Sequence, residues 1–324
     1  MNNSTVIGID LAKTVIQVCK INKDGELISN KAISPNKLKQ FLAKSTPSII
    51  AMEGCGCCHF WGRYAEKYGH DVRIISPKKV KGFLQGQKTD ANDAIAIAVA
   101  ATQLGVRFSP IKGEVQQSLQ TLETSRRFLG RELTALNNHI RAFLYEYGIT
   151  MNKGRKSLRA IIPIVLDDSD TRLPQCLRGT LTVLWDRFQS TESQYKAIEK
   201  SKAALVKQIE PCKRLLELEG VGSVCASMLY TSIGDGSEFR NGRDASVYIG
   251  LTPKQHSSGG KTYMRGIDKS GGNRELRSAL YQGALSVITR LSTEPRTAKE
   301  AWLIELVKRA GIKRACIALA NKTV

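Results

Sequence analysis

Short apolar runs separated by turn residues fill the first third of the chain. We expect strands at residues 5–9, 15–21, 26–33, 48–53 and 71–75, and helices at residues 35–43, 59–68 and 90–104. Asn22-Lys23-Asp24-Gly25 has the composition of a hairpin turn, so the second and third strands should pair as neighbours. Hairpin strands followed by alternating helix and strand are the element order of a ribonuclease-H-like fold. Residues 1–110 are therefore predicted to form an α/β domain.

The middle of the chain changes to a heptad-like pattern. A first apolar seam, with spacings of three and four and one gap of seven, consists of Val115, Leu119, Leu122, Leu129, Leu133, Leu136, Ile140 and Phe143. A second seam consists of Leu181, Leu184, Phe188, Tyr195, Ile198, Leu205 and Ile209. The segment between the seams is basic and loop-like at residues 152–156, then apolar at residues 161–166. We predict a helical coiled-coil domain over residues 111–210, whose two helices pair within one chain or between two chains.

Residues 211–324 are predicted to form a small, mainly helical domain. The stretch Leu218-Glu219-Gly220-Val221-Gly222-Ser223 has the form of a helix-hairpin-helix turn. Gly220 and Gly222 would let the backbone approach a phosphate, and the next helix would offer free amides to it. Taken alone, this short signal favours an ordinary glycine turn, but in a chain with a net charge of +20 it favours phosphate binding. The whole chain is thus expected to be a multi-domain protein, α/β followed by α.

Four carboxylates stand where a strand end or a first helical turn would usually avoid them. Asp10 and Glu53 each end an apolar run. Asp90 and Asp93 open a helical stretch and lie three residues apart, so they share a helix face. If these four side chains converge, they form an oxygen cage for Mg²⁺ or Mn²⁺, the ions that support two-metal phosphodiester chemistry.

The charge of the chain is far from balanced. It contains 49 Lys and Arg residues against 29 Asp and Glu residues, a net charge of +20, which exceeds what solubility requires. This surplus indicates a polyanionic partner, namely nucleic acid, and Lys88 beside the carboxylates is one candidate contact. No apolar stretch reaches 18 residues and the N-terminus has no secretion-signal pattern, so we expect a cytoplasmic protein without a membrane span.

The eight cysteines do not form a disulfide framework in a chain of this length. Cys55, Cys57 and Cys58 cluster with His59 directly after Glu53, and all four could bind a metal. No second Cys or His pair follows at zinc-finger spacing, so a tight turn of small residues is the better interpretation. Reduced thiols also suit a cytoplasmic location.

A second chemically unusual stretch extends from Gly250 to Lys261. Ser257 and Ser258 precede two glycines, and Lys254, Lys261 and Arg265 lie close by in the sequence. A flexible loop of this kind could present a hydroxyl nucleophile to a phosphodiester, with cations stabilising the transition state and His256 as a possible base. On physical grounds alone, a plain glycine-rich loop with solvated serines is the favoured interpretation. Arg274 and Arg277, which open the following helix, could contact phosphate or be solvated.

Four motifs, in order along the chain, resemble those of a known family. They are Gly8-Ile9-Asp10-Leu11-Ala12-Lys13, Met52-Glu53-Gly54-Cys55-Gly56, Lys88-Thr89-Asp90-Ala91-Asn92-Asp93-Ala94, and the Gly250–Gly260 stretch followed by Gly271–Leu276. Together they resemble the Piv/MooV-type DEDD transposases, the IS-one-ten insertion-sequence family. The Gly-Cys-Gly after Glu53, followed by His59 and Trp61, is similar to the IS-eleven-eleven subgroup.

This resemblance implies a RuvC-like ribonuclease-H domain, a coiled coil and a smaller transposase domain. It implies DNA recombination, with Mg²⁺ held by Asp10, Glu53, Asp90 and Asp93 and with Ser258 as a nucleophile that joins DNA covalently. It also implies a homo-oligomer, a dimer or a tetramer, whose serine and carboxylates combine across subunits. The implied partners are element-end and target DNA at the bacterial nucleoid and a noncoding, bridge-type guide RNA. The last helix of such a protein is expected to continue beyond Val324.

Two other functions are compatible with the same residues. A RuvC-like structure-specific nuclease would use the four carboxylates and a metal-activated water without needing Ser258. A non-catalytic nucleic-acid-binding scaffold would use the helix-hairpin-helix turn and the coiled coil alone. A covalent protein–DNA adduct separates recombination from hydrolysis, and metal-dependent activity separates both from the scaffold.

Overall fold

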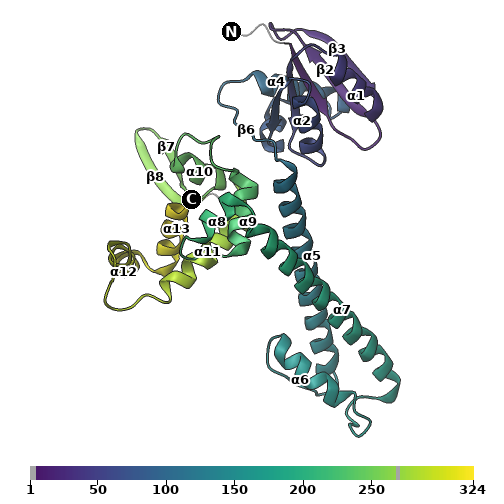
Figure 1. Cartoon of the computed structure of the whole chain (residues 1–324), viewed down its shortest axis with the longest axis vertical. Coiled ribbons are helices and arrows are strands. Elements are labelled where there is room, and N and C mark those ends of the chain that lie inside the picture. The colour runs from purple at the N-terminus through teal and green to yellow at the C-terminus, as the bar shows by residue number, and fades with distance from the viewer. Residues whose placement is uncertain (1–4, 268–270) are drawn as a thin grey trace. The chain divides into compact units, whose positions relative to one another are not determined.

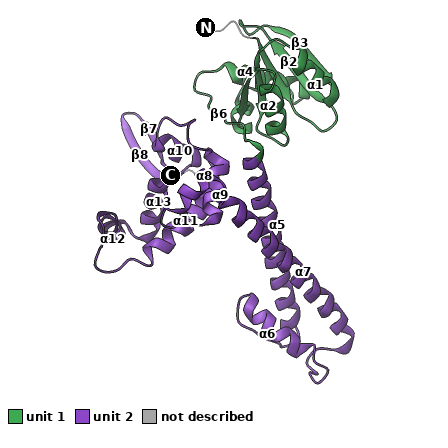
Figure 2. Ribbon diagram, in the orientation of Figure 1, with its two compact units in different colours: residues 1–114 green, residues 115–324 purple. Residues whose placement is uncertain are grey.

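The computed structural model describes residues 5–267 and 271–324. The chain forms two compact units, residues 1–114 and residues 115–324, coloured separately in Figure 2. The boundary expected near residue 110 lies close to this division, while the boundary at residue 210 stays a prediction. Each unit is described by itself.

Unit 1, the purple to blue part of the ribbon in Figure 1, is built on a six-stranded mixed sheet with the strand order β3-β2-β1-β4-β5-β6. The strands are β1 (Val6–Asp10), β2 (Ile16–Ile21), β3 (Leu27–Ile33), β4 (Ile49–Glu53), β5 (Asp71–Ile75) and β6 (Phe108–Ser109). The parallel strands are β1, β4 and β5, and the other neighbours are antiparallel. All five strands expected from the sequence are present. Strand β6 was not expected, because two residues are too few to give a periodic signal.

Helices cover both faces of this sheet. They are α1 (Pro35–Lys44), α2 (Cys58–Glu66), α3 (Pro77–Val80), the short 3₁₀ helix η1 (Lys81–Phe83) and α4 (Asp90–Thr102). Leu38 and Leu42 of α1 and Trp61 of α2 pack on one face of the sheet. Ile97 and the alanines of α4 pack on the other face. This three-layer mixed α/β arrangement is consistent with a ribonuclease-H-like transposase domain.

Unit 2 begins with two long helices that pair within the chain. These are α5 (Glu114–Tyr145, entering from the end of unit 1) and α7 (Gln175–Val206), with α6 (Arg155–Val165) in the connection. Lys202 contacts Glu123 while Arg187 contacts Glu132, so the helices run antiparallel. The two apolar seams face each other in this pair, as the intrachain alternative requires.

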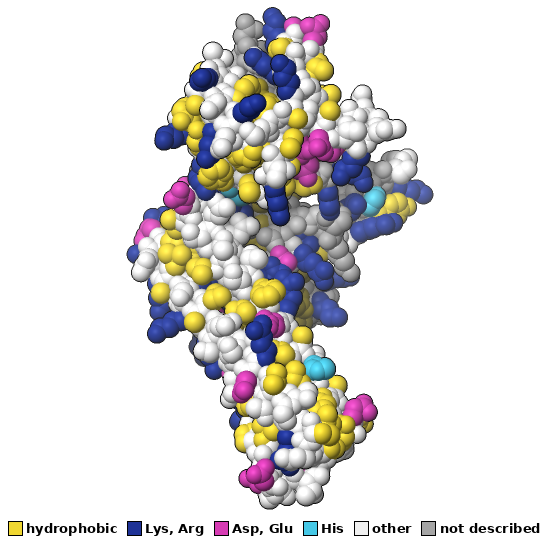
Figure 3. Space-filling view, turned by 90° about the vertical axis from the view of Figure 1, so that its right-hand side faces the viewer, with side chains coloured by type: hydrophobic (Ala, Val, Ile, Leu, Met, Phe, Trp, Pro, Cys, Tyr) yellow, Lys and Arg dark blue, Asp and Glu magenta, His cyan; other side chains and the backbone are white. Residues whose placement is uncertain are grey.

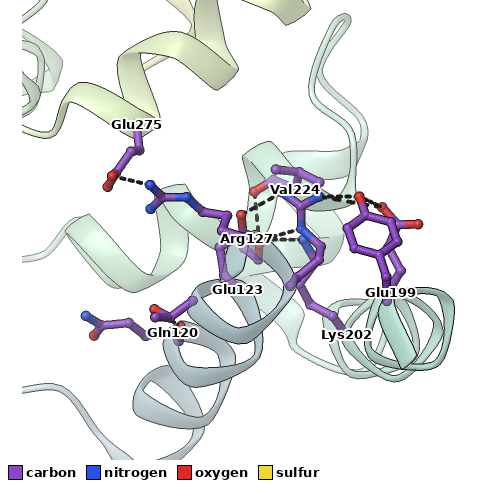
Figure 4. Close-up of polar contacts among 11 residues, drawn as sticks. Gln120, Glu123, Arg127, Glu199, Lys202, Val224 and Glu275 are labelled. Carbon is purple, nitrogen blue, oxygen red and sulfur yellow. Dashed lines mark hydrogen bonds and ion pairs between the residues drawn. The ribbon is translucent and has the colours of Figure 1, made fainter. Parts of the chain in front are cut away.

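A buried polar network crosses between these helices (Figure 4). The Nζ atom of Lys202, which is fully buried, donates to Glu123 Oε2 at 2.6 Å. Arg126 Nη1 donates to Tyr195 Oη at 2.7 Å, and Tyr195 Oη donates to Glu199 Oε1 at 2.9 Å. Burial raises the pKa of Glu123, but hydrogen bonds from Arg126 and Lys202 outweigh it and hold the pKa below its ordinary value. Removing one partner would leave a buried charge without its counter-charge. The network therefore fixes the register of α5 against α7.

The remaining elements of unit 2 follow the long helices in the chain. They are α8 (Glu210–Leu216), α9 (Ser223–Ile233), α10 (Gly242–Ile249), β7 (Pro253–Ser258), β8 (Lys261–Ile267), α11 (Arg274–Ile288), α12 (Ala298–Ala310) and α13 (Ile312–Thr323). Leu119 of α5 and Val206 of α7 share one apolar core with Leu229, Leu276 and Leu280. In the described residues, we found no helix with the length and apolar character needed to cross a membrane.

Candidate active site and nucleic-acid interface

The two strand-end carboxylates lie on one face of the sheet in unit 1. Gly8 of β1 and Ala51 of β4 pack against the α4 layer. Side chains two residues further along a strand point to the same face, so Asp10 and Glu53 also face the α4 side. Because β1 and β4 are parallel neighbours, both carboxylates stand at the same edge of the sheet.

The other two carboxylates lie in the first turn of α4, which begins at Asp90. Thr89 caps the helix, since its hydroxyl accepts a hydrogen bond from the backbone N–H of Asn92 at 3.3 Å. Asp90 and Asp93 follow on one helix face, where the positive end of the helix dipole favours negative charge. The spacing noted in the sequence therefore corresponds to a helix start beside the sheet.

Asp10 interacts electrostatically with all three other carboxylates. Burial raises the pKa of Asp10, the charges of Asp93, Asp90 and Glu53 raise it further, and Lys88 opposes them. Burial also raises the pKa of Glu53, again with Asp93 adding to the shift and Lys88 opposing it. The four carboxylates and Lys88 thus form one electrostatic group.

Gly8 fixes the distance between β1 and α4. A Cβ atom at this position would lie 2.4 Å from the carbonyl oxygen of Ala94 and 2.7 Å from the backbone nitrogen of Ala98. Only glycine allows so close an approach of strand and helix. This contact holds the carboxylate of β1 at a fixed separation from those of α4.

Two amide side chains connect the antiparallel strands to the start of α4. Gln17, which is opposite Asp10 in the sheet, donates from Nε2 to Asn30 Oδ1 at 2.6 Å. Asn30 in turn donates from Nδ2 to the carbonyl oxygen of Ala91 at 3.0 Å. Sequence inspection missed these positioning residues, because Asn30 and Ala91 are 61 residues apart and share no local pattern.

The donor set suits a hard divalent cation. Carboxylate oxygens are the ligands that Mg²⁺ and Mn²⁺ prefer, and a cation would relieve the repulsion that raises the pKa of Asp10. Within the described ranges, no three His, Cys, Asp or Glu side chains lie close enough together to form a metal-binding group. The oxygen cage expected from the sequence therefore stays a prediction, supported by the electrostatic interaction of Asp10 with the other three carboxylates, and holding an ion would require the side chains to draw together.

The cysteine-rich segment after Glu53 is a tight turn. The backbone N–H of Cys58 donates to the carbonyl oxygen of Cys55 at 3.5 Å, and Cys57 adopts a left-handed φ of 69°. The Nδ1 atom of His59 accepts a hydrogen bond from the backbone N–H of Lys112 at 3.2 Å. All eight cysteines are free thiols, and the segment forms the tight turn that the sequence favoured.

Ser258 ends a strand at the tip of an exposed hairpin in unit 2. The sequence predicted a flexible loop here, and that prediction is wrong. Strands β7 and β8 pair antiparallel, with Ser258 opposite Lys261. Gly259 and Gly260 join the strands with φ angles of 55° and 75°, a combination typical of a two-residue type I′ turn. The strands escaped notice because their polar residues show no apolar alternation.

The two adjacent serines have different surroundings. Neighbouring residues of a strand point to opposite faces. Ser257 Oγ accepts a hydrogen bond from Gln255 Nε2 at 3.0 Å and lies 3.4 Å from Thr262 Oγ1. Over the described residues, no such side-chain hydrogen bond involves Ser258, which is exposed. Its hydroxyl is therefore the more available of the two.

The hairpin is strongly basic. Lys254, Lys261 and Arg265 are all exposed on it, as is His256. The segment Pro253–Ile267 contains no Asp or Glu. Lys and Arg side chains also spread widely over the face drawn in Figure 3. The three cations expected to contact nucleic acid thus remain available to a phosphate backbone.

Arg277 differs from both alternatives derived from the sequence, because it neither faces solvent nor presents itself to a phosphate. Its side chain is buried, and Nη1 donates to the carbonyl oxygens of Ile249 and Gly271 at 2.9 and 2.5 Å. It therefore ties together the two chain segments that flank the hairpin. Arg274, at the start of α11, is exposed and remains available to contact a phosphate.

The glycine turn for which the sequence predicts a helix-hairpin-helix form lies between α8 and α9, and its Gly220 serves packing. With a φ of 79°, its added Cβ would lie 2.7 Å from the carbonyl oxygen of Gly283 in α11, so this glycine allows turn and helix to touch. Gly222 precedes α9, and a Cβ there would meet nothing within 4 Å. A cavity of about 1000 Å³ adjoins the turn, and its lining residue Arg127 is paired with Glu275 (Figure 4).

Two family models match the chain. The model for the Transposase IS116/IS110/IS902 family matches residues 212–300, and a transposase model of the DEDD IS110 type matches residues 7–149. The first of these regions contains the basic hairpin, and the second contains all four carboxylates.

Several proteins are similar to this chain over almost its full length. A probable family 20 transposase of Pseudomonas aeruginosa is 35% identical over 321 residues, covering 99% of this chain and 94% of the relative. The transposase for insertion sequence element IS1111A of Coxiella burnetii is 35% identical over 322 residues, covering 99% and 88%. The pilin gene-inverting protein of Moraxella lacunata is 22% identical over 302 residues, covering 88% and 83%.

Proposed function

Because this chain belongs to the IS116/IS110/IS902 family of transposases, which cleave and rejoin DNA, we propose that it recombines the ends of an insertion sequence with target DNA by metal-dependent serine chemistry. The observation that carries this proposal is the pKa of Asp10, at the end of β1, which burial raises and which the charges of Asp93, Asp90 and Glu53 raise further. The sheet order β3-β2-β1-β4-β5 supports a RuvC-like assignment for unit 1.

The four carboxylates would hold Mg²⁺ or Mn²⁺ in unit 1. When bound, such an ion supplies positive charge that polarises a scissile phosphate and stabilises its transition state. Lys88 lies within electrostatic reach of Asp10 and Glu53, so it would orient the same phosphate. Gly8 and the Gln17–Asn30 pair keep the ligand-bearing backbones in place.

Ser258 would be the nucleophile. Its Oγ forms a bond to phosphorus, the bond from phosphorus to one sugar oxygen breaks, and that oxygen takes up a proton as the serine loses one. The phosphodiester energy is conserved in the serine linkage, so a second sugar hydroxyl can reverse the step and rejoin DNA. Lys261, directly opposite Ser258, would stabilise the added negative charge.

The surplus of positive charge supports binding of a bridge-type guide RNA in addition to the two DNA partners. Such binding would depend mainly on Lys and Arg contacts to phosphate. The antiparallel pair of α5 and α7 presents exposed apolar side chains, Phe128 and Val183, that would support assembly of a dimer or a tetramer. Oligomer formation would let serine and carboxylates of different subunits act together.

A denaturing gel tests the proposal directly. The full chain is incubated with Mg²⁺, labelled element-junction DNA and the flanking noncoding RNA, and Ser258→Ala is compared with Ser257→Ala. We expect a slow-migrating, protease-sensitive DNA band for the wild type and for Ser257→Ala, and none for Ser258→Ala. Both variants should bind nucleic acid normally, since neither hydroxyl is needed for the fold.

Other outcomes of this gel would support a different function. Free cleaved DNA from all three proteins would identify a nuclease that uses water and would remove Ser258 from the mechanism. An absence of metal-dependent DNA change in every sample would support a binding scaffold. Omitting the RNA shows separately whether a guide is required.

A further inference from the structure

The β7–β8 hairpin has two chemically distinct faces. Residues directly opposite each other in an antiparallel pair share a face, and the face alternates with each residue. The register pairs Ser258 with Lys261 and His256 with Tyr263, so these four side chains share one face. Ser257, Thr262, Gln255 and Met264 share the other, in agreement with the contacts of Ser257 to Gln255 and Thr262.

Tyr263 is an exposed aromatic ring on the serine face. Its exposed fraction is 58%, and across the described residues its ring makes no aromatic or cation–π contact. Tyr263 lies two residues beyond Lys261, a separation of about 7 Å along a strand. An aromatic ring beside cations is the combination with which proteins hold unpaired nucleic-acid strands.

We propose that the serine face of this hairpin binds an unpaired nucleotide of the DNA strand under attack, with its base stacked on Tyr263 and its phosphate beside Lys261. The inference rests on the proposed role of Ser258, because that role makes the attacked DNA strand the nearest polyanion. A base can stack on the ring only after it leaves its own stack. The absence of Asp and Glu from Pro253–Ile267 removes repulsion against the strand. The hairpin therefore selects DNA that is locally open at the cleavage position.

Met264 provides a matched control on the opposite face. It is the neighbour of Tyr263, and its exposed fraction of 63% is similar. Removing either side chain costs little buried area, so both alanine variants should keep the fold. Tyr263→Val preserves a strand-favouring residue while removing the ring, and Tyr263→Phe preserves the ring.

The experiment measures affinity of the full-length protein for a fluorescent single-stranded DNA of mixed sequence, and for the matching blunt duplex, by anisotropy. We expect Tyr263→Ala and Tyr263→Val to weaken single-strand binding about 5- to 100-fold, the range that loss of one stacked base produces. Tyr263→Phe and Met264→Ala should stay within about twofold of wild type, and duplex binding should change less than single-strand binding. A 2-aminopurine base in the strand should lose its quenching in the variants without the ring.

Equal losses in Tyr263→Ala and Met264→Ala, or equal losses on single strand and duplex, would overturn the proposal. A loss confined to single-stranded RNA of the same sequence would overturn its assignment to DNA. The covalent-adduct gel with Ser258→Ala distinguishes this site from the proposed function. If Ser258→Ala still forms the adduct while Tyr263→Val loses single-strand affinity, the nucleotide site stands and only the nucleophile assignment fails.

Discussion

At the level of single residues, ionised Asp10 in the candidate site destabilises the folded state. Its folded pKa is raised, chiefly by burial and then by the neighbouring carboxylates, so the folded state binds a proton more tightly than the unfolded chain. The ionised form therefore destabilises the fold above that pKa, and the effect fades as the pH falls through it.

We expect Asp10→Asn to raise the melting temperature in the presence of a chelator at neutral pH by about 1–3 °C. The gain should shrink as the pH falls through the range in which Asp10 takes up its proton. Calorimetry across that pH range measures both effects, and Asp24→Asn in an exposed turn is the control. A large drop in melting temperature for Asp10→Asn would contradict this account of the site.

Arg277 and Arg274 give a second test at the same scale, since they are three residues apart and have opposite surroundings. Arg277→Ala would remove the donor from the carbonyl oxygen of Gly271 and one of two donors from that of Ile249, which also accepts from the backbone N–H of Asn273, and we expect a cost of about 1–3 kcal/mol. Arg274→Ala should leave the free energy of unfolding unchanged and weaken nucleic-acid binding modestly. Denaturant unfolding and anisotropy on both variants check the pair. The reverse result would restore Arg277 as a phosphate contact.

At the scale of elements, the close approach of β1 to α4 determines whether the carboxylates remain grouped. Gly8→Ala would place a methyl group 2.4 Å from the carbonyl oxygen of Ala94, so helix and strand must separate. We expect a loss of about 1–3 kcal/mol in unfolding free energy and a loss of DNA cleavage with all four carboxylates intact. Gly82→Ala is the control, because a Cβ there meets nothing within 4 Å. Full activity of Gly8→Ala would show that the spacing is not needed.

The elements also show what the sequence could and could not predict. The strands of unit 1 are apolar on buried faces, so their periodicity predicted them and the carboxylates at their ends. Strands β7 and β8 are exposed on both faces, so no apolar pattern marked them, and the Gly259-Gly260 pair was the available signal. The contact from Asn30 to Ala91 depends on the tertiary fold and has no local sequence pattern at all.

At the scale of the whole molecule, the net charge of +20 predicts strongly salt-dependent nucleic-acid binding. The cations of the β7–β8 hairpin should account for a defined part of this salt dependence. Replacing Lys254, Lys261 and Arg265 together by Gln should reduce the slope of log affinity against log salt for single-stranded DNA by about 2, at roughly 0.7 per phosphate contact. The matched control is the triple replacement of Lys37, Lys39 and Lys44, all exposed on α1. Equal reductions would mean that charge acts without regard to position.

The glycine turn of the hairpin has a consequence for what Ser258 can reach. Gly259 and Gly260 carry no side chains, and added Cβ atoms at either position would meet nothing within 4 Å. Ser258 and Lys261 are thus the last residues with side chains before the turn, and only glycine backbone joins them. A partner can therefore approach the hydroxyl past the turn without meeting a side chain there, so access to the reacting atom is limited by the shape of the partner.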